Sequence, residues 1–259
     1  MDDNVSGRYS GQVLFKPIGV DGQARLRDSR VVIIGCGALG TGIADRLARS
    51  GTGHIKIIDR DFVEFDNLQR QSLFNEEHAR ERLPKAVAAE RVLSSINSEI
   101  KIKGVVGDVT PANIEDLLGG CDLVMDATDN LETRFLMNDA CVKLEIPWVH
   151  GAVGGSCGQE MLIVPGATAC FRCYLPELPQ VTLPGVDVLG VLNTITGLTA
   201  ELQTTHAIQV LTGDAARGGV LTYVDIWEKE FLQFDVERLL ECPACAKGEY
   251  SFLDSENIS

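Results

Sequence analysis

Short apolar runs alternate with segments of helical character along the first half of the chain. Four runs have the length and composition of buried strands, at residues 31–34, 55–58, 101–106 and 123–125. The segments between them predict helices, including residues 111–118 and 131–144 and a helix that ends near Asn97. Strands that alternate with helices form a parallel sheet with helices on both faces. The pattern predicts a Rossmann-like, doubly wound α/β sheet.

The second half of the chain has a different order of elements. Two short strands are expected at residues 147–150 and 161–164, around a glycine-rich turn. A long helix follows over residues 193–212 and ends at Gly213, and two more strands are expected at 221–227 and 231–234. We expect these C-terminal strands to be antiparallel and to extend the same sheet.

One domain is expected for all 259 residues, because the hydrophobic share of 45% is ample for a large core. Within it we expect a nucleotide-binding half (31–150) and a half for substrate and zinc (151–259). Residues 1–30 precede the first strand and are weakly helical at 22–28. They are expected to form an arm that lies over this domain or over a second subunit.

Three glycines follow the first strand with the spacing G-x-G-x-x-G: Gly35, Gly37 and Gly40. In a strand–turn–helix unit these glycines allow a tight turn, a close approach of a phosphate, and close packing of helix on strand. The helix start then offers free N–H groups to an anion. Asp59 ends the second strand, at the usual distance for a carboxylate that binds a ribose hydroxyl. A nucleotide is expected, and the glycines alone leave a nicotinamide or flavin dinucleotide open.

The loop after Asp59 favours a triphosphate. It contains Asp61, Asn67 and Arg70, and an arginine fork matches phosphate oxygens. A solvated charged loop is the alternative. Lys85 stands at the start of the next helix, where a cation is unfavourable unless an anion lies nearby, so we expect it to meet phosphate. An exposed lysine that is merely tolerated there remains the alternative.

The fourth strand leads into Asp126-Ala127-Thr128-Asp129-Asn130, at the edge where ligands bind in such sheets. Asp129 there could hold Mg²⁺ that bridges nucleotide phosphates. Alternatively, Asp129 and Glu132 form a capping box for the next helix. His150 has no partner identifiable from the sequence and is given no role.

Two C-x-x-C pairs, Cys170/Cys173 and Cys242/Cys245, have the ligand spacing of a closed four-thiolate zinc site. Such a site is structural and would tie the C-terminal tail to the middle of the chain. A redox dithiol is the rival interpretation. The other four cysteines are scattered singly, as buried free thiols are in a reducing compartment.

The charge of the chain excludes some partners. A net charge of −14 argues against a nucleic-acid or anionic membrane surface, since both call for clustered Lys and Arg. The sequence has neither a secretory signal nor an apolar run long enough to span a bilayer. We therefore expect a cytoplasmic protein that binds no nucleic acid and no membrane.

The motifs taken in order resemble the ThiF/MoeB/HesA group of adenylyltransferases, the bacterial relatives of ubiquitin-activating enzymes. The resemblance covers residues 8–247 and rests on R-Y-S-G-Q, G-C-G-A-L-G, D-R-D-F-V-E-F-D-N-L-Q-R-Q, P-K-A-V-A-A, D-A-T-D-N, I-P-W-V-H-G and the two C-x-x-C pairs. It implies ATP, Mg²⁺ and Zn²⁺ as cofactors and a homodimer. It further implies that the substrate is the C-terminal glycine of a ThiS- or MoaD-like ubiquitin-fold sulfur carrier, which becomes an acyl adenylate as pyrophosphate leaves.

The same resemblance implies roles for individual residues. Arg70 and Lys85 would bind the phosphates, and Asp129 would position Mg²⁺ and the α-phosphate, which makes these three the expected catalytic residues. The nucleotide would be lined by Gly35, Gly37, Ala38, Gly40, Asp59, Asp61, Asp66, Asn67, Leu68, Gln69, Arg70, Lys85, Asp129 and Asn130.

Two positions depart from the family pattern. Gly11 stands where the arm motif R-Y-x-R-Q has its second arginine, which reaches the partner subunit's ATP, so one cationic contact is expected to be missing. Many relatives also carry a cysteine in the loop after the first C-x-x-C, whereas the aligned position here is Val186, before Asp187. An enzyme that leaves sulfur transfer to another protein is therefore expected. A small carboxylic acid as substrate, or a weakly active ATP-binding scaffold, are the alternatives.

Overall fold

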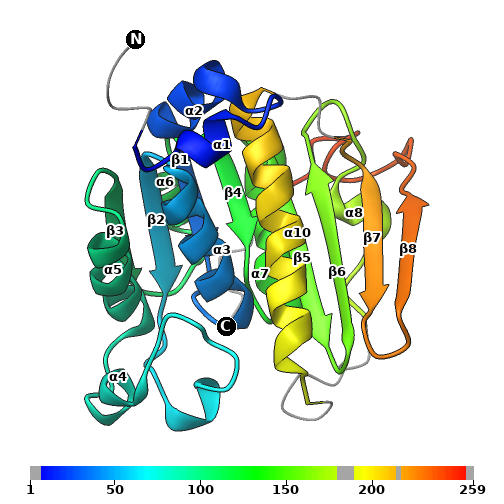
Figure 1. The fold of residues 1–259 in the computed structure, drawn as a ribbon. Coiled ribbons are helices and arrows are strands. Elements are labelled where there is room, and N and C mark those ends of the chain that lie inside the picture. Colours follow the sequence, from blue (N-terminus) through cyan, green and yellow to red (C-terminus); the bar gives the residue numbers. More distant parts are fainter. Residues whose placement is uncertain (1–6, 180–189, 214–216, 255–259) are drawn as a thin grey trace.

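The structure is a computed structural model that describes residues 7–179, 190–213 and 217–254. Its centre is an eight-stranded sheet (Figure 1). In spatial order the strands are β3 (Lys101–Val106), β2 (His54–Asp59), β1 (Arg30–Ile34), β4 (Leu123–Asp126), β5 (Trp148–Gly154), β6 (Cys157–Ile163), β7 (Val220–Asp225) and β8 (Glu230–Asp235). The strands from β3 to β5 are parallel, and those from β5 to β8 are antiparallel. The predicted fold class is confirmed.

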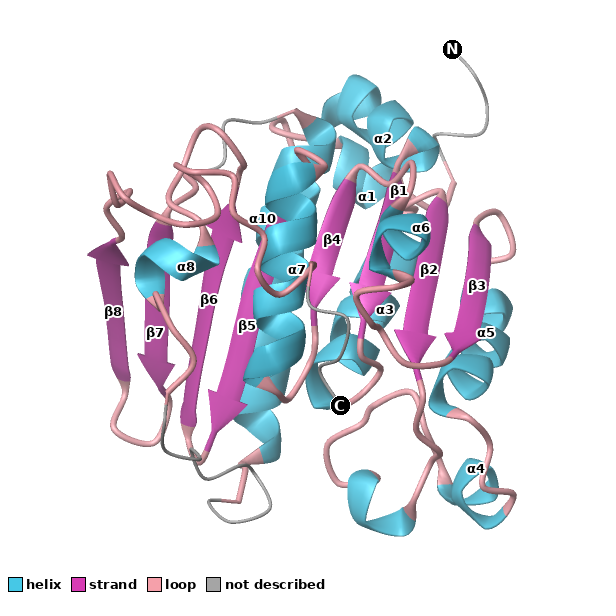
Figure 2. Ribbon diagram, turned by 180° about the vertical axis from the view of Figure 1, so that it is seen from behind, coloured by secondary structure: helices cyan, strands magenta, loops and turns pink. Residues whose placement is uncertain are grey.

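Helices cover both faces of the sheet (Figures 1 and 2). Two consecutive residues of β1 point to opposite faces of the sheet. Ile33 packs into the core beneath α3, α5 and α10, and Ile34 packs into the core beneath α6, α7 and α8. The helices are α1 (Ser10–Val13), α2 (Gly19–Asp28), α3 (Ala38–Ser50), α4 (Glu76–Arg80), α5 (Lys85–Ile96), α6 (Ile114–Leu118), α7 (Leu131–Lys143), α8 (Phe171–Tyr174) and α10 (Asn193–Thr212), with a 3₁₀ turn at Phe65–Asn67.

The N-terminal arm lies over its own domain. Asn97 Nδ2 donates to Tyr9 Oη at 2.8 Å, and Gln12 Nε2 donates to the carbonyl of Ser50 at 2.9 Å. The helix α2 packs against α10. Of the two arrangements that the sequence allowed, the structure describes the intramolecular one. No helix among the described residues is both long and apolar enough to cross a membrane.

The glycine-rich segment after Trp148 was expected to be mainly a turn, and this expectation is wrong. β5 runs on to Gly154 and β6 begins at Cys157, so the turn itself is only Gly155 and Ser156. The two strands pair along their whole lengths, and pairing with a neighbour overrides the low strand preference of glycine.

The order of the parallel strands creates a crevice. β1 lies between β2 and β4, so the chain leaves β1 toward one side of the sheet and later returns to the other side. Ligands bind at such a point, beyond the carboxyl ends of the strands. The carboxyl ends of β1, β2 and β4 lie at this crevice. They are marked by Gly35, which follows β1, by Asp59, which ends β2, and by Ala127, which follows β4.

Candidate nucleotide site and metal centre

The glycine loop between β1 and α3 has the geometry that its spacing predicts. Gly35 has φ +94°, and a Cβ there would lie 2.4 Å from the carbonyl oxygen of Ala127. A Cβ on Gly40 would lie 2.1 Å from the carbonyl oxygen of Gly35. Around Gly37 there is room, since the nearest described atom to a Cβ is Gln71 Nε2 at 4.0 Å. Gly37 precedes Ala38, the first residue of α3, and its position offers no side-chain cap, so the first N–H groups of this helix can bind an anion.

Asp59 is fixed by backbone groups of this loop. Its Oδ2 accepts from the Cys36 amide at 2.6 Å, and its Oδ1 accepts from the Asp61 amide at 2.7 Å. Burial raises the pKa of the Asp59 carboxyl, and the two amides oppose this shift. The carboxylate is thus held rigidly beside the glycine loop, as the expected ribose ligand must be.

The loop after β2 carries five of the predicted nucleotide residues, Asp66 to Arg70, within and just after the 3₁₀ turn. Asn67 is buried and donates from Nδ2 to Asp66 Oδ1 at 2.9 Å. Arg70 donates to the carbonyl of Asp66 at 3.0 Å and remains half-buried. Leu68 packs against the core, and Gln69 is exposed.

Gln71 follows Arg70 in this loop and was not among the expected nucleotide residues. It is buried, and its Nε2 lies beside Gly37. Its Oε1 has no hydrogen-bond partner among the described residues. A buried amide that lacks a partner next to the glycine loop fits a site that a polar ligand completes.

Lys85 is the first residue of α5, and its side chain is only 9% exposed. Its Nζ lies 3.0 Å from Asp61 Oδ2, and its amide donates to the Asp61 carbonyl at 2.8 Å. The anion that offsets the unfavourable helix position is therefore Asp61 in this structure. The alternative of an exposed, merely tolerated lysine is wrong.

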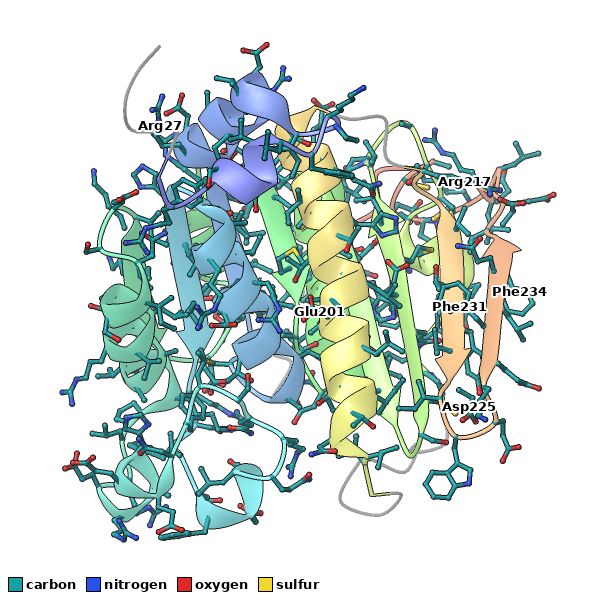
Figure 3. The ribbon with its side chains drawn as sticks, viewed as in Figure 1. Arg27, Glu201, Arg217, Asp225, Phe231 and Phe234 are labelled. Carbon is teal, nitrogen blue, oxygen red and sulfur yellow. The ribbon has the colours of Figure 1, made fainter. Side chains whose placement is uncertain are left out.

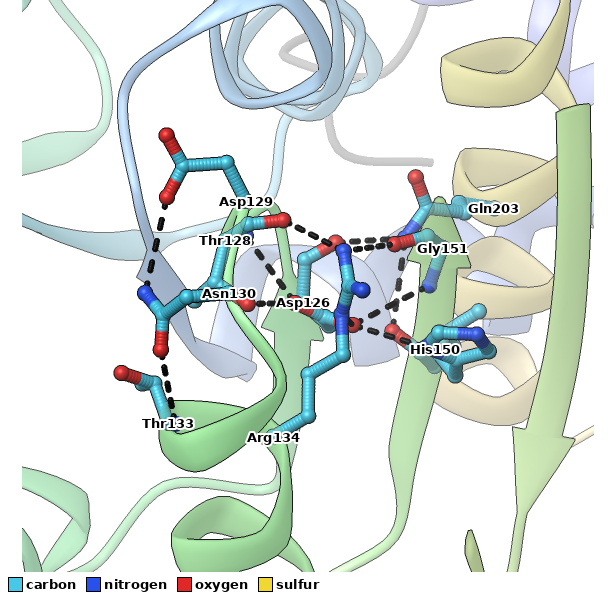
Figure 4. Close-up of polar contacts among 10 residues, drawn as sticks. Asp126, Thr128, Asp129, Asn130, Thr133, Arg134, His150, Gly151 and Gln203 are labelled. Atoms are coloured by element: carbon cyan, nitrogen blue, oxygen red, sulfur yellow. Dashed lines mark hydrogen bonds and ion pairs between the residues drawn. The ribbon is translucent and has the colours of Figure 1, made fainter. Parts of the chain in front are cut away.

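The start of α7 corrects one interpretation of the sequence. The N-cap is Asn130, whose Oδ1 accepts from the Thr133 amide at 2.9 Å, and not Asp129 with Glu132 (Figure 4). Asn130 has the extended backbone of an N-cap, which places its side chain over the helix end. Asp129 is exposed and accepts only a long contact of 3.5 Å from Asn130 Nδ2. Its carboxylate is thus not needed by the helix.

A buried polar cluster behind this loop was missed by the sequence analysis. Asp126 Oδ2 lies 3.0 Å from Arg134 Nε and 2.8 Å from His150 Nδ1, and all three residues are buried (Figure 4). Burial raises the pKa of Asp126, but Arg134 and His150 outweigh it and lower that pKa to about 2. Burial lowers the pKa of His150, so the neutral ring donates through Nδ1. The one signal in the sequence was Asp126 at the end of an otherwise apolar strand.

The four paired cysteines converge although the two pairs are far apart in the chain. The Sγ atom of Cys170 lies 3.9 Å from that of Cys173 and 3.5 Å from that of Cys242, and Cys173 and Cys245 are 3.5 Å apart. All four sulfurs lie within 4.8 Å of one another. A tetrahedral ion with metal–sulfur bonds of about 2.3 Å requires edges of about 3.8 Å. The four cysteines can therefore hold one metal ion in a closed site.

Of the two positions that depart from the family pattern, Gly11 is the one that lies among the described residues. Gly11 lies in α1, and a Cβ there would meet no described atom within 4 Å. Arg8, which remains from the arm motif, donates to the Ile96 carbonyl at 2.9 Å. Val186 and Asp187 lie outside the described residues.

Comparison with known proteins identifies the family. The model of the ThiF family matches residues 9–244. The sulfur carrier protein ThiS adenylyltransferase of Bacillus subtilis is 44% identical over 98% of this chain and 75% of its own length. The SAMP-activating enzyme E1 of Haloferax volcanii is 35% identical over 96% of this chain and 92% of its own.

Solved structures agree on the fold. The crystal structure of Escherichia coli MccB with MccA-N7isoASN superposes with a TM-score of 0.82 at 22% identity, over 95% of this chain and 76% of MccB. MccB crystallised with ATP gives a TM-score of 0.81, also at 22% identity, over 94% and 76% of the two chains. The glycine loop, the carboxylate at the end of β2 and the sequence match over most of the chain lead to one conclusion: this protein belongs to the ThiF family.

Proposed function

We propose that this protein is an ATP-dependent adenylyltransferase. Its substrate is the C-terminal glycine carboxylate of a ThiS- or MoaD-like ubiquitin-fold sulfur carrier, which it converts to an acyl adenylate with release of pyrophosphate. The observation that carries the proposal is the 44% identity to a ThiS adenylyltransferase along 98% of the chain. The carboxyl ends of the parallel strands support it, because Asp59 lies against the glycine loop there and Lys85 lies beside the neighbouring Asp61.

The chain would hold ATP by residues of three adjacent strands. Asp59 accepts from the ribose, and the first amides of α3, after Gly37, face the phosphates. Lys85 and Arg70 supply positive charge. Attack of a carboxylate on the α-phosphate brings two anions together, so positioning and charge neutralisation account for most of the rate. On this proposal Lys85 exchanges Asp61 for phosphate when ATP binds.

Two metal ions belong to the proposal. Mg²⁺ would be held by the phosphates and by Asp129, whose exposed carboxylate is not engaged in capping α7. It would neutralise phosphate charge. Zn²⁺ would occupy the four-cysteine site, where it closes the site and does no chemistry.

We propose further that the protein works as one domain and as a cytoplasmic homodimer. Apolar side chains at the end of the arm support a second copy: Leu14, Phe15 and Val20 are exposed by 81%, 60% and 57%. Large apolar side chains exposed this close together in the chain are consistent with an interface. Other proteins would supply the sulfur and carry out the later steps of the pathway, since no cysteine lies between Cys173 and Cys242.

Exchange between ATP and radioactive pyrophosphate tests the function. Purified protein is assayed with Mg²⁺ and a panel of ubiquitin-fold carriers that end in Gly-Gly, and in parallel with small carboxylic acids. The proposal expects exchange only with a carrier, and none when the terminal glycine is removed. Exchange driven by a free acid and indifferent to carriers would favour the small-acid alternative instead.

The missing arm arginine is tested in the same assay. Gly11→Arg has room for its side chain and, in the proposed homodimer, restores one cation to the ATP site of the partner subunit, so exchange is expected to rise about tenfold. Binding of ATP without exchange by either protein would identify a scaffold and contradict the proposed activity.

Nucleotide binding is tested by a matched pair of variants. In Asp59→Asn the amide can no longer accept both backbone N–H groups and the ribose, so the Kd for ATP is expected to rise about tenfold or more. Asp122→Asn is the control, since Asp122 accepts from the Arg30 amide at 2.7 Å at the opposite edge of the sheet. Equal losses of affinity in the two variants, measured by calorimetry, would argue against a ribose role for Asp59.

A further inference from the structure

The strands β4 and β5 separate just before the loop that leads to α7. Their ladder pairs only Val124 with Trp148 and Met125 with Val149. Beyond these pairs β5 continues along β6, while the chain after Asp126 turns away toward residues 128–130. Backbone groups that would pair in a longer ladder therefore need other partners, because buried unpaired groups are costly.

Two side chains replace the missing ladder. Gln203, from α10, donates through Nε2 to the carbonyl of Asp126 at 2.7 Å and to that of Val149 at 3.3 Å. Asp126 Oδ2 accepts from the amide of Gly151 at 3.3 Å. Gly151 must lack a side chain here, since a Cβ would lie 2.3 Å from Gln203 Cδ. The amide of Gln203 thus lies against the strand at the point of separation.

Arg134 connects this point to the loop. Its Nε donates to Asp126 Oδ2 at 3.0 Å, and its Nη2 donates to the carbonyls of Thr128 at 2.6 Å and Gly151 at 3.2 Å (Figure 4). Asp126 Oδ1 accepts from the Thr128 amide at 2.9 Å and from its hydroxyl at 2.7 Å. The planar guanidinium fork is what lets one side chain reach three acceptors.

We propose that Asp126, Arg134 and Gln203 are positioning residues for the proposed adenylation, on which this inference rests. They hold β4 and β5 apart at a set separation and fix residues 128–130. Asp129 and Asn130 are thereby presented to the nucleotide in one orientation. The three residues touch neither ATP nor carrier; they act through the loop.

Arg134→Lys tests this with a closely matched control. Lysine keeps the charge but cannot make the three contacts together. Arg172→Lys is the control: both arginines are 7% exposed, and Arg172 pairs with the buried Asp139, away from the loop. Gln203→Met, with Gln209→Met on the same helix as its control, is the second pair if Arg134→Lys does not fold.

Hydrogen exchange of the nucleotide-free protein is the first measurement. Amides of residues 127–133 are expected to exchange about tenfold faster in Arg134→Lys than in the unmodified protein or in Arg172→Lys. A merely structural role would raise exchange throughout the sheet. Unchanged exchange at 127–133, or a rise spread evenly over β4 and β5, would overturn the inference.

Kinetics are the second measurement. In pyrophosphate exchange, kcat is expected to fall roughly tenfold to a hundredfold in Arg134→Lys, while the KM for the carrier stays near that of the unmodified protein. A kcat no lower than that of Arg172→Lys would overturn the inference. Absence of exchange in the unmodified protein would overturn the proposed function instead, and hydrogen exchange would then decide the inference alone.

Discussion

At the scale of single residues, the largest departure from sequence expectation is Asp126. Asp126 is fully buried, and burial by itself raises the pKa of its carboxyl. The contacts to Arg134 and His150 outweigh this effect and lower the pKa to about 2. A group whose pKa is lower in the folded chain stabilises the fold above its unfolded pKa of 3.8, and the stabilisation is lost as the pH falls toward 2.

The lowered pKa of Asp126 gives a prediction for acid unfolding. Asp126→Asn leaves Arg134 buried without its anion and is expected to lower the free energy of unfolding at pH 7 by about 3–5 kcal/mol. The difference from the unmodified protein should shrink by roughly 2 kcal/mol between pH 4 and pH 2, where Asp126 itself becomes protonated. Urea unfolding at several pH values measures it, with the exposed Asp116→Asn as control. A constant difference across this range would contradict an ionised Asp126.

At the scale of elements, β8 is the outer strand of the sheet and all six of its residues are exposed. Phe231 and Phe234 are exposed by 56% and 51%, and Figure 3 shows both at this outer edge. A long apolar edge strand is a template for pairing with another chain. We expect the carrier of the proposed function to dock at this edge.

The carrier interface is testable by substitution at this edge. Phe234→Ser is expected to raise the KM for the carrier about tenfold, because an exposed aromatic anchor is lost, and to leave ATP affinity unchanged. Val106→Ser is the control: Val106 is 48% exposed and ends β3, the strand at the opposite edge. Steady-state exchange kinetics distinguish the two, and an equal effect of both variants would argue against docking at β8.

At the scale of the whole molecule, topology separates the metal centre from the nucleotide site. Cys170 follows β6 and Cys242 follows β8, and both strands run opposite to the parallel strands whose carboxyl ends form the candidate nucleotide site. The helix α8, which contains Cys173, lies over the antiparallel half of the sheet (Figure 2). A metal ion held by the four cysteines would join the C-terminal tail to the fold, away from the proposed reaction.

Loss of the metal is therefore expected to lower the stability of the protein and to leave ATP binding unchanged. Cys242→Ser is expected to lower the Tm by about 5 °C or more, because metal binding adds to folding energy, while ATP affinity stays within about twofold. Calorimetry provides both measurements, and metal analysis confirms the loss. Cys157→Ser, outside the four-cysteine site, is the control. A parallel loss of ATP affinity in Cys242→Ser alone would place the metal closer to function than the topology does.

The strands, the glycine turn and the two cysteine pairs were predictable because each depends on local spacing: apolar runs, G-x-G-x-x-G and C-x-x-C. A capping role for Asp129 was one of two alternatives, and the N-cap of α7 is Asn130; both residue types cap helices, and only the backbone distinguishes them. The full lengths of β5 and β6 were missed because pairing overrides the weak strand preference of glycine.

The sequence by itself therefore determined the order of elements, the glycine turn and the four cysteines of the candidate metal site, all of which are encoded within short segments. Only the tertiary structure decided how distant residues meet. It brought Gln203, Arg134 and His150 to Asp126 where β4 and β5 part, and it paired Lys85 with Asp61. These contacts arise from the crossing of separate helices over one sheet, and no local pattern in the chain specifies which polar side chains will face one another there.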